Sequence, residues 1–235
     1  MTPFIVIRHE KLKKEGVRVA LKHNSRASKP ANADADRRNL NQRFIGGTDE
    51  DAIKRLRSIV DEHEEAAGKS IRKDAVWAVE VLLTMSPEYF RPNGEEPGEW
   101  SESRLQRWKA ATEKFIEDEY GEDVITADLH LDEMTPHIHL VIAPRVGKKL
   151  CCKKYNEKKE LIRKRTAYFE RLTWDGIDCQ RGEAREGAKH ITVKEYYAVI
   201  EEARKAGITP EEIQVYVRSH AAAGTAHGLE AYGRA

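Results

Sequence analysis

The sequence predicts an α/β domain of the α+β type, in which helices pack on a central antiparallel sheet and a helical tail follows at the C-terminus. The chain has 235 residues, a length that suits one domain with a peripheral extension. Short apolar strands alternate with amphipathic helices. Two neighbouring strands are separated by Asp-Glu-Met-Thr-Pro, which favours an antiparallel hairpin. We expect the domain to span residues 1–205, and a partly disordered helical extension to span 206–235.

The individual elements follow from local patterns. β-Branched and apolar runs predict strands at 3–8, 74–84, 123–131 and 137–144. Periodic apolar residues and capping signals predict helices at 14–24, from Thr48 to about Ala67, from Ser101 to about Tyr120, at about 157–172, at about 193–205 and from Thr209 onward. The long segment 25–47 is rich in Ser, Asn, Asp and Arg, so we expect a loop that carries function or is ordered by a ligand.

Composition excludes several classes of protein. No apolar run approaches the roughly 18 residues of a membrane span, and the first one covers only Phe4 to Ile7, shorter than the roughly 7 of a signal peptide. Cys151, Cys152 and Cys179 form no CxxC pair and are odd in number, which argues against a zinc knuckle and a disulfide scaffold. We therefore expect a cytoplasmic protein rather than an integral membrane or secreted one.

The charge distribution is uneven although the net charge is only +1. Residues 1–47 contain 11 Lys and Arg against 4 Asp and Glu, and residues 145–165 contain 10 against 2. Residues 48–123 contain 11 against 20. Two basic segments and an acidic middle are compatible with a basic nucleic-acid groove and an acidic back, although solvated helix faces would give the same counts.

The stretch His130-Leu-Asp-Glu-Met-Thr-Pro-His-Ile-His139 is the most informative part of the sequence. Side chains alternate between the faces of a strand, so His137 and His139 share one face, and His130 shares a face with Thr126 and Asp128. The opposite faces are apolar, with Ile125, Ala127, Leu129 and Leu131 on one strand and Ile138, Leu140 and Ile142 on the other.

Because both apolar faces must point toward the helices, all three histidines are expected to converge. Three imidazoles that leave coordination positions open are typical of a catalytic metal site. Glu133 is the preferred candidate for a carboxylate that holds an imidazole N–H, and Asp132 is the alternative.

The histidine stretch resembles the motif of the MobV (Pre/Mob) family of plasmid mobilisation relaxases. Further segments match in order: Lys22-His23-Asn24-Ser25-Arg26, Ile71-Arg72-Lys73-Asp74-Ala75-Val76, and Arg181-Gly182 followed by Ala188-Lys189-His190-x-Thr192-Val193. The resemblance spans residues 5 to about 200. It implies an HUH-type endonuclease fold and a relaxase that nicks one DNA strand at a transfer origin and stays joined to the 5′ phosphate.

The same resemblance implies the roles of individual residues. His130, His137 and His139 would bind a divalent metal, Mn²⁺ by preference with Mg²⁺ as a substitute, and Glu133 would support them. His23 would be the nucleophile and Arg26 would bind the neighbouring phosphate. DNA contacts are expected from Lys22, Asn24, Arg26, Arg37, Arg38, Arg72, Lys73, Lys148, Lys149, Lys153, Lys154, Arg181 and Lys189. The implied partners are transfer-origin DNA as single strand and hairpin, a second copy bound through a C-terminal region, and a conjugation apparatus.

One departure from the family pattern bears on the nucleophile. The family often has Asn-Tyr in its second motif, whereas this chain has Gln42 there and no tyrosine before Tyr89. This favours His23 as the nucleophile in an active enzyme.

Three rival interpretations remain open. The first is a Rep-like replication initiator that uses Tyr155 of Tyr155-Asn-Glu-Lys158. The second is a metal-dependent hydrolase of small substrates, and the third is a DNA-binding protein without activity.

Overall fold

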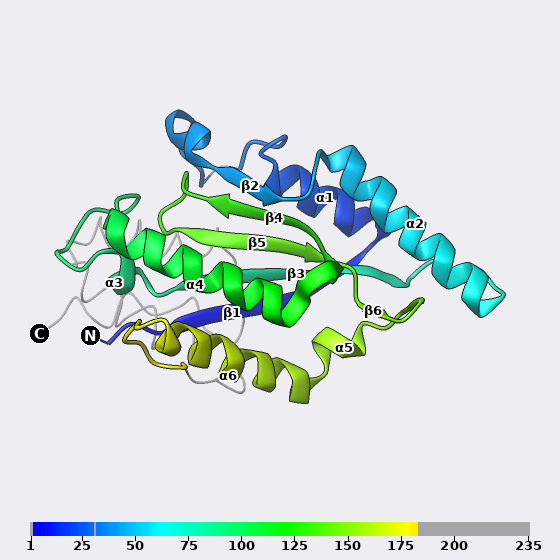
Figure 1. The fold of residues 1–235 in the computed structure, drawn as a ribbon. Coiled ribbons are helices and arrows are strands. Elements are labelled where there is room, and N and C mark those ends of the chain that lie inside the picture. The colour runs from blue at the N-terminus through cyan, green and yellow to red at the C-terminus, as the bar shows by residue number, and fades with distance from the viewer. Residues whose placement is uncertain (1, 31, 183–235) are drawn as a thin grey trace, which may run out of the picture. The chain divides into compact units, whose positions relative to one another are not determined.

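The computed structural model describes residues 2–30 and 32–182, and its centre is a five-stranded antiparallel sheet (Figure 1). The strand order is β1-β3-β5-β4-β2. The strands are β1 (Ile5–Lys13), β2 (Gln42–Ile45), β3 (Val76–Met85), β4 (Val124–His130) and β5 (His137–Ile142). The predicted fold class is confirmed, and so is the antiparallel hairpin of β4 and β5.

Helices connect the strands of the sheet. They are α1 (Lys14–Asn24), α2 (Asp49–Ala67), α3 (Pro87–Phe90), α4 (Glu102–Tyr120), α5 (Lys153–Asn156) and α6 (Lys158–Trp174), with 3₁₀ helices η1 (Ala35–Leu40) and η2 (Gly121–Asp123). A small hairpin of β6 (Arg145–Val146) and β7 (Lys149–Leu150) follows β5. The predicted cap of α2 is present as a capping box, in which Thr48 Oγ1 accepts from the Asp51 N–H and Asp51 Oδ2 accepts from the Thr48 N–H.

Each face of the sheet has its own apolar core. Helices α4 and α6 cover one face, where Trp108, Phe115 and Tyr168 pack on Leu83, Leu129, Ile138 and Leu140. Figure 1 shows α4 lying across this near face. Helices α1 and α2 cover part of the other face, where Leu21, Leu56 and Val60 pack near Ala78 and Val141. The sheet is therefore a middle layer, buried on both sides over much of its length.

The structure corrects three expectations. Segment 25–47 is not a loop throughout, because η1 and the edge strand β2 lie in it and β2 pairs with β4. Strand β1 extends beyond residue 8 to Lys13, since its polar second half pairs with β3. A bulge in β4 moves Ile125 to the core beneath α1 and α2, away from Ala127 and Leu129.

Several expectations fall outside the described residues. These are the helix at 193–205, the extension at 206–235, the domain boundary at 205, and Lys189 with the rest of the closing motif beyond Gly182. Across residues 2–30 and 32–182, no helix is long and apolar enough to cross a membrane.

Candidate active site

The β4–β5 hairpin brings three imidazoles together at one end of the sheet. His130 lies directly opposite His137, and Asp128 lies opposite His139. The ring centroids of His130, His137 and His139 are 5.0 Å apart in all three pairs. The side chains thus converge on the sheet face that α1 and α2 also cover, because residues 137, 139 and 141 alternate with the apolar residues of the other face.

Hydrogen bonds set the tautomers of all three rings. His130 Nε2 lies 2.9 Å from the Asn24 carbonyl oxygen, and His137 Nδ1 lies 2.9 Å from the Thr135 carbonyl oxygen. Because a carbonyl oxygen can only accept, each of these nitrogens must carry the hydrogen. His139 Nδ1 likewise donates to the Glu80 carboxylate at 3.0 Å. In the neutral rings the other nitrogens, His130 Nδ1, His137 Nε2 and His139 Nε2, therefore keep free lone pairs.

The free lone pairs fit a bound metal ion. His130 Nδ1 and His137 Nε2 face each other at 3.2 Å, and two lone pairs at this separation repel unless a cation lies between them. Two nitrogen ligands at roughly 2.1 Å from a common ion and at right angles would be about 3 Å apart. Glu133 Oε1 lies 3.7 Å from His137 Nε2 and 4.0 Å from His130 Nδ1. Imidazoles whose second nitrogen donates to a carbonyl or a carboxylate are the usual protein ligands of catalytic metals.

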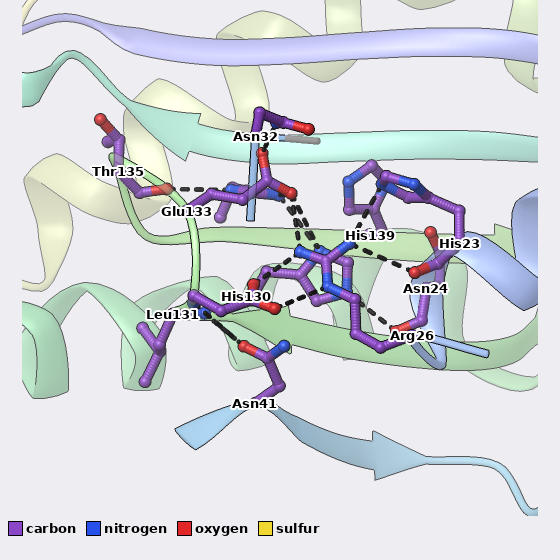
Figure 2. A network of polar contacts seen from close by, with 12 residues as sticks. His23, Asn24, Arg26, Asn32, Asn41, His130, Leu131, Glu133, Thr135 and His139 are labelled. Carbon is purple, nitrogen blue, oxygen red and sulfur yellow. Dashed lines mark hydrogen bonds and ion pairs between the residues drawn. The ribbon is translucent and has the colours of Figure 1, made fainter. Parts of the chain in front are cut away.

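Arg26 ties this cluster to the segment after α1. Its Nε and Nη2 donate to the two oxygens of Asp132 at 2.8 and 2.6 Å, and Nη2 also donates to Glu133 at 2.7 Å. Its Nη1 contacts His23 Nε2 at 3.3 Å and the His23 carbonyl oxygen at 3.2 Å. All five N–H groups of the guanidinium are thereby engaged, as Figure 2 shows in part. A phosphate could bind Arg26 only by displacing one of these partners.

His23 lies at the C-terminal end of α1, close to the metal-site rings, the imidazoles of His130, His137 and His139. Its ring centroid is 5.9 Å from that of His130 and 5.5 Å from that of His139. The helix ends at Asn24, and Arg26, two residues beyond it, has a left-handed backbone with φ of 59°. This conformation costs a non-glycine residue roughly 1–2 kcal/mol. The buried contacts of the Arg26 side chain with two carboxylates offset that cost.

Burial favours the neutral form of His23, His130 and His139. It lowers the pKa of His130 and of His139, and the charge of neighbouring rings lowers both further. Burial and the adjacent Arg26 guanidinium also lower the pKa of His23. Neutral imidazole is the form that binds a metal and the form that can act as a nucleophile.

The two acidic residues of the motif contact different partners. Asp132 is buried and pairs with Arg26, while Glu133 accepts from Arg26 and from Asn32 Nδ2 at 2.5 Å. Glu133 holds no imidazole N–H; Glu80 does so instead. Glu80 also accepts from Asn24 Nδ2 at 3.1 Å. Sequence reasoning missed Glu80, although a lone acidic residue in the apolar run Val-Glu-Val of β3 could have signalled it.

The expected DNA-binding residues divide into two groups. Lys22, Asn24, Arg26, Arg37 and Arg38 lie in or after α1, on the side of the histidines, although Asn24 is buried and bonded to Glu80. The other group precedes β3 or follows β5, at the opposite end of the sheet, about 20 Å away over the six residues of β5. Its members are Arg72, Lys73, Lys148, Lys149, Lys153 and Lys154. Arg181 is exposed and donates to Thr166.

Tyr155 lies in the core beneath α4 and α6, on the sheet face away from the histidines. Its side chain is 2% exposed, and its hydroxyl donates to Asp123 Oδ2 at 2.6 Å. Burial and the Asp123 carboxylate raise its pKa. These features remove Tyr155 as the nucleophile of a replication initiator.

Comparisons with known proteins agree with this geometry. The Mob_Pre model, described as plasmid recombination enzyme, matches residues 1–198. A 65 kDa protein of Zymomonas mobilis is 30% identical over 85% of this chain, and a plasmid recombination enzyme of Lactiplantibacillus plantarum is 28% identical over 90%. The chain spans only 33% and 58% of these two relatives.

Among solved structures, the chain is similar to the MobM relaxase domain bound to plasmid pMV158 oriT DNA, in a Mn-bound crystal structure. The TM-score is 0.72 and the identity 26%, over 84% of this chain and 99% of that one. A further Mn-bound complex of the same domain with a 22-nucleotide DNA gives a TM-score of 0.71. The family match and these shared folds lead to one conclusion: the chain belongs to the Mob_Pre family of plasmid recombination enzymes.

Proposed function

We propose that this chain is a DNA relaxase that nicks one strand of a plasmid transfer origin by metal-assisted transesterification and becomes joined to the 5′ phosphate through a histidine. One observation carries the proposal. His130, His137 and His139, with ring centroids 5.0 Å apart, each bond one ring nitrogen to a protein oxygen and leave the other for a metal, and a fourth imidazole, His23, lies beside His130 and His139. The oriT DNA in the MobM complexes supports the substrate class.

His130, His137 and His139 would hold the metal, with Glu133 next to it. Manganese is favoured because the related MobM domain is Mn-bound, and Mg²⁺ is a candidate substitute. When bound, the ion would polarise the scissile phosphate and neutralise charge that develops on its oxygens. Glu80 and the Asn24 and Thr135 carbonyl groups would keep the three rings in the required tautomer.

His23 would supply the nucleophile. His23 Nε2, the ring nitrogen without hydrogen, attacks phosphorus once Arg26 Nη1 has released it. The bond to the 3′ oxygen of the preceding nucleotide breaks, and that oxygen leaves with a proton. The remaining N–H of His23 gives up its hydrogen, so the product is a neutral ring joined by a nitrogen–phosphorus bond. Arg26 would position the His23 ring by its contact with Nε2 and hold Glu133 at the same time. The bond energy is kept for later religation because each step exchanges one phosphate ester-type bond for another.

DNA would reach the site along the basic residues near α1. A cavity of about 240 Å³ beside the cluster is lined in part by Arg26, Arg38 and Asn41, and could take part of one nucleotide. The second basic group, at the far end of the sheet, would contact more distant DNA such as an origin hairpin. The protein would act in the cytoplasm. It would form a homodimer through a C-terminal region and would couple to a conjugation apparatus.

Incubation with a supercoiled plasmid that carries the DNA flanking this protein's gene tests the proposal. With Mn²⁺, we expect a nick at a single position on one strand, and protein that stays bound to the 5′ end in denaturant. Chelation of the metal should prevent both. A free 5′ phosphate at a single nick would indicate a hydrolase, and intact DNA under all metal conditions would indicate a DNA-binding protein without activity.

A further inference from the structure

A row of three side chains leads from the metal site to the edge strand β1. In the sheet register, His139 of β5 lies opposite Leu82 of β3, and Leu82 lies opposite Arg8 of β1. Residues directly opposite one another share a face, so Arg8 stands on the imidazole face. Neighbouring strands are about 4.8 Å apart, which places the Arg8 Cα roughly 10 Å from the His139 Cα. Figure 1 shows β1, β3 and β5 side by side.

This part of the imidazole face is open in the described chain. Toward α1 and α2, the residues of the same face are buried, as Leu12, Ala78 and Val141 illustrate. Around the row, Leu82 and Thr84 are only half-buried, and Arg8 is exposed. A strand of DNA that brings its scissile phosphate to the imidazoles would therefore find an accessible surface over β3 and β1.

Arg8 is also available to bind an anion, unlike Arg26 and Arg43. The guanidinium of Arg26 is fully engaged, and Arg43 pairs with Asp128 at 2.7 Å and with Asp49 at 2.9 Å. Within residues 2–30 and 32–182, Arg8 forms neither an ion pair nor a side-chain hydrogen bond. The charge of Arg8 acts on the Glu80 carboxyl only through space, without direct contact. A guanidinium that no carboxylate contacts can bind a phosphate through two parallel hydrogen bonds.

We propose that Arg8 binds a backbone phosphate that flanks the scissile phosphate and thereby holds the DNA strand on the open surface over β1 and β3. This inference rests on the proposed relaxase function. It adds a DNA-positioning residue that the sequence motifs did not indicate. Arg8 takes the phosphate-binding role for which Arg26 has no free donor in the present arrangement.

The matched control lies on the same strand. Lys11 is exposed and pairs in register with Val79, a residue of the α4 and α6 core, so it stands on the face away from the histidines. Lys11→Gln removes the same charge from the same strand as Arg8→Gln. We expect Arg8→Gln to weaken binding of an oligonucleotide that spans the mapped nick site by about tenfold or more and to lower the nicking rate at limiting DNA. Arg8→Lys should retain part of the affinity, and Lys11→Gln should behave as wild type.

Neutral methylphosphonate linkages, placed one at a time around the nick, locate the contact. At one flanking position, the methylphosphonate should weaken binding to the wild-type protein as much as Arg8→Gln weakens binding to unmodified DNA. At that position the methylphosphonate should not weaken the binding of Arg8→Gln any further. At other positions, the loss of affinity caused by the methylphosphonate and the loss caused by Arg8→Gln should multiply. Affinity is measured by fluorescence anisotropy with the full chain and Mn²⁺, and thermal unfolding verifies that the variants are folded.

Two results would overturn the inference: wild-type affinity of a folded Arg8→Gln variant, or losses that multiply at every position. Failure of the relaxase function is a different result, because wild-type protein would then bind the oligonucleotide without cutting it. In that case the methylphosphonate comparison still decides whether Arg8 contacts a phosphate.

Discussion

The two faces of the sheet bury polar rings with different hydrogen-bond patterns. On the face beneath α4 and α6, Trp108 Nε1 donates to the Tyr168 hydroxyl at 2.9 Å, and that hydroxyl contacts Thr112 Oγ1 at 3.1 Å. The polar atoms of these three side chains thus satisfy one another. On the imidazole face, His130, His137 and His139 each bond one ring nitrogen to a protein oxygen, and the second nitrogens of His130 and His137 face each other at 3.2 Å without a hydrogen between them (Figure 2).

This difference separates a structural role from a binding role. An unsatisfied buried polar atom costs roughly 1–3 kcal/mol, so a core avoids such atoms. Several neighbouring lone pairs without a donor are tolerated where a bound cation accepts them. We therefore assign the Trp108–Tyr168–Thr112 group to stability and propose metal binding for the imidazole group. Changes on the two faces should have separable effects.

The largest effect is expected from His137→Ala. Loss of one of three imidazole ligands should lower Mn²⁺-dependent nicking by at least about 100-fold, because the phosphate is no longer polarised. The unfolding transition without metal should change little or shift to higher stability, since the repulsion with His130 Nδ1 is removed. Nicking assays and urea unfolding in chelator measure the two quantities. A folded His137→Ala variant that nicks at the wild-type rate would contradict the assignment.

Trp108→Ala should have the opposite signature. The indole is fully buried and packs edge-to-face on Phe90, with ring centroids 5.2 Å apart. Its removal should lower the free energy of unfolding by roughly 3–5 kcal/mol. Affinity for Mn²⁺, measured per folded molecule by calorimetry at low temperature, should stay unchanged. Selective loss of metal binding without loss of stability would show that the two faces are not separable.

His9 tests the same comparison through pH. Its ring lies on the α4 and α6 face and contacts the Tyr120 hydroxyl at 2.9 Å. Burial, helped by the charges of Lys164 and Arg165, lowers its pKa from 6.5 to about 4. Because the unfolded chain takes up the proton first, the neutral ring stabilises the fold fully above pH 6.5 and loses this contribution as pH falls toward 4.

Replacement of His9 by phenylalanine should remove this pH dependence. Between pH 6.5 and 4, wild type should lose about 3 kcal/mol more of its free energy of unfolding than His9→Phe. Urea unfolding at several pH values measures the difference, and other titrating groups cancel in the comparison. Parallel curves for the two proteins would mean that folding does not lower the pKa of His9.

The parts of the site that follow a local pattern could be predicted from the sequence. Alternation along two strands was sufficient to group His130, His137 and His139, because a hairpin fixes which residues face each other. The cap of α2 at Thr48 and the apolar side of α4 followed from equally local signals. The role of His23 was inferred from a family resemblance, and the structure places its ring beside those of His130 and His139.

The parts that depend on distant strands could not be predicted. Glu80 approaches His139 only because β3 lies between β1 and β5, an order that no local pattern contains. Arg8 joins the imidazole face for the same reason. The edge strand β2 has only four residues, and its pairing with β4 requires the chain to return from α1. Likewise, the carboxylates that occupy Arg26 come from the β4–β5 connection, more than 100 residues later.

The chemical identity of the covalent link tests the central claim most directly. Protein that has nicked DNA should carry the 5′ nucleotide on His23, as a phosphoramidate that survives denaturant and alkali but is released by mild acid. His23→Ala should lose the adduct and keep Mn²⁺ and DNA binding, while Tyr155→Phe should form it normally. Peptide mapping by mass spectrometry identifies the linked residue. An acid-stable link, or a nucleotide found on Tyr155 or on any residue other than His23, would contradict the account.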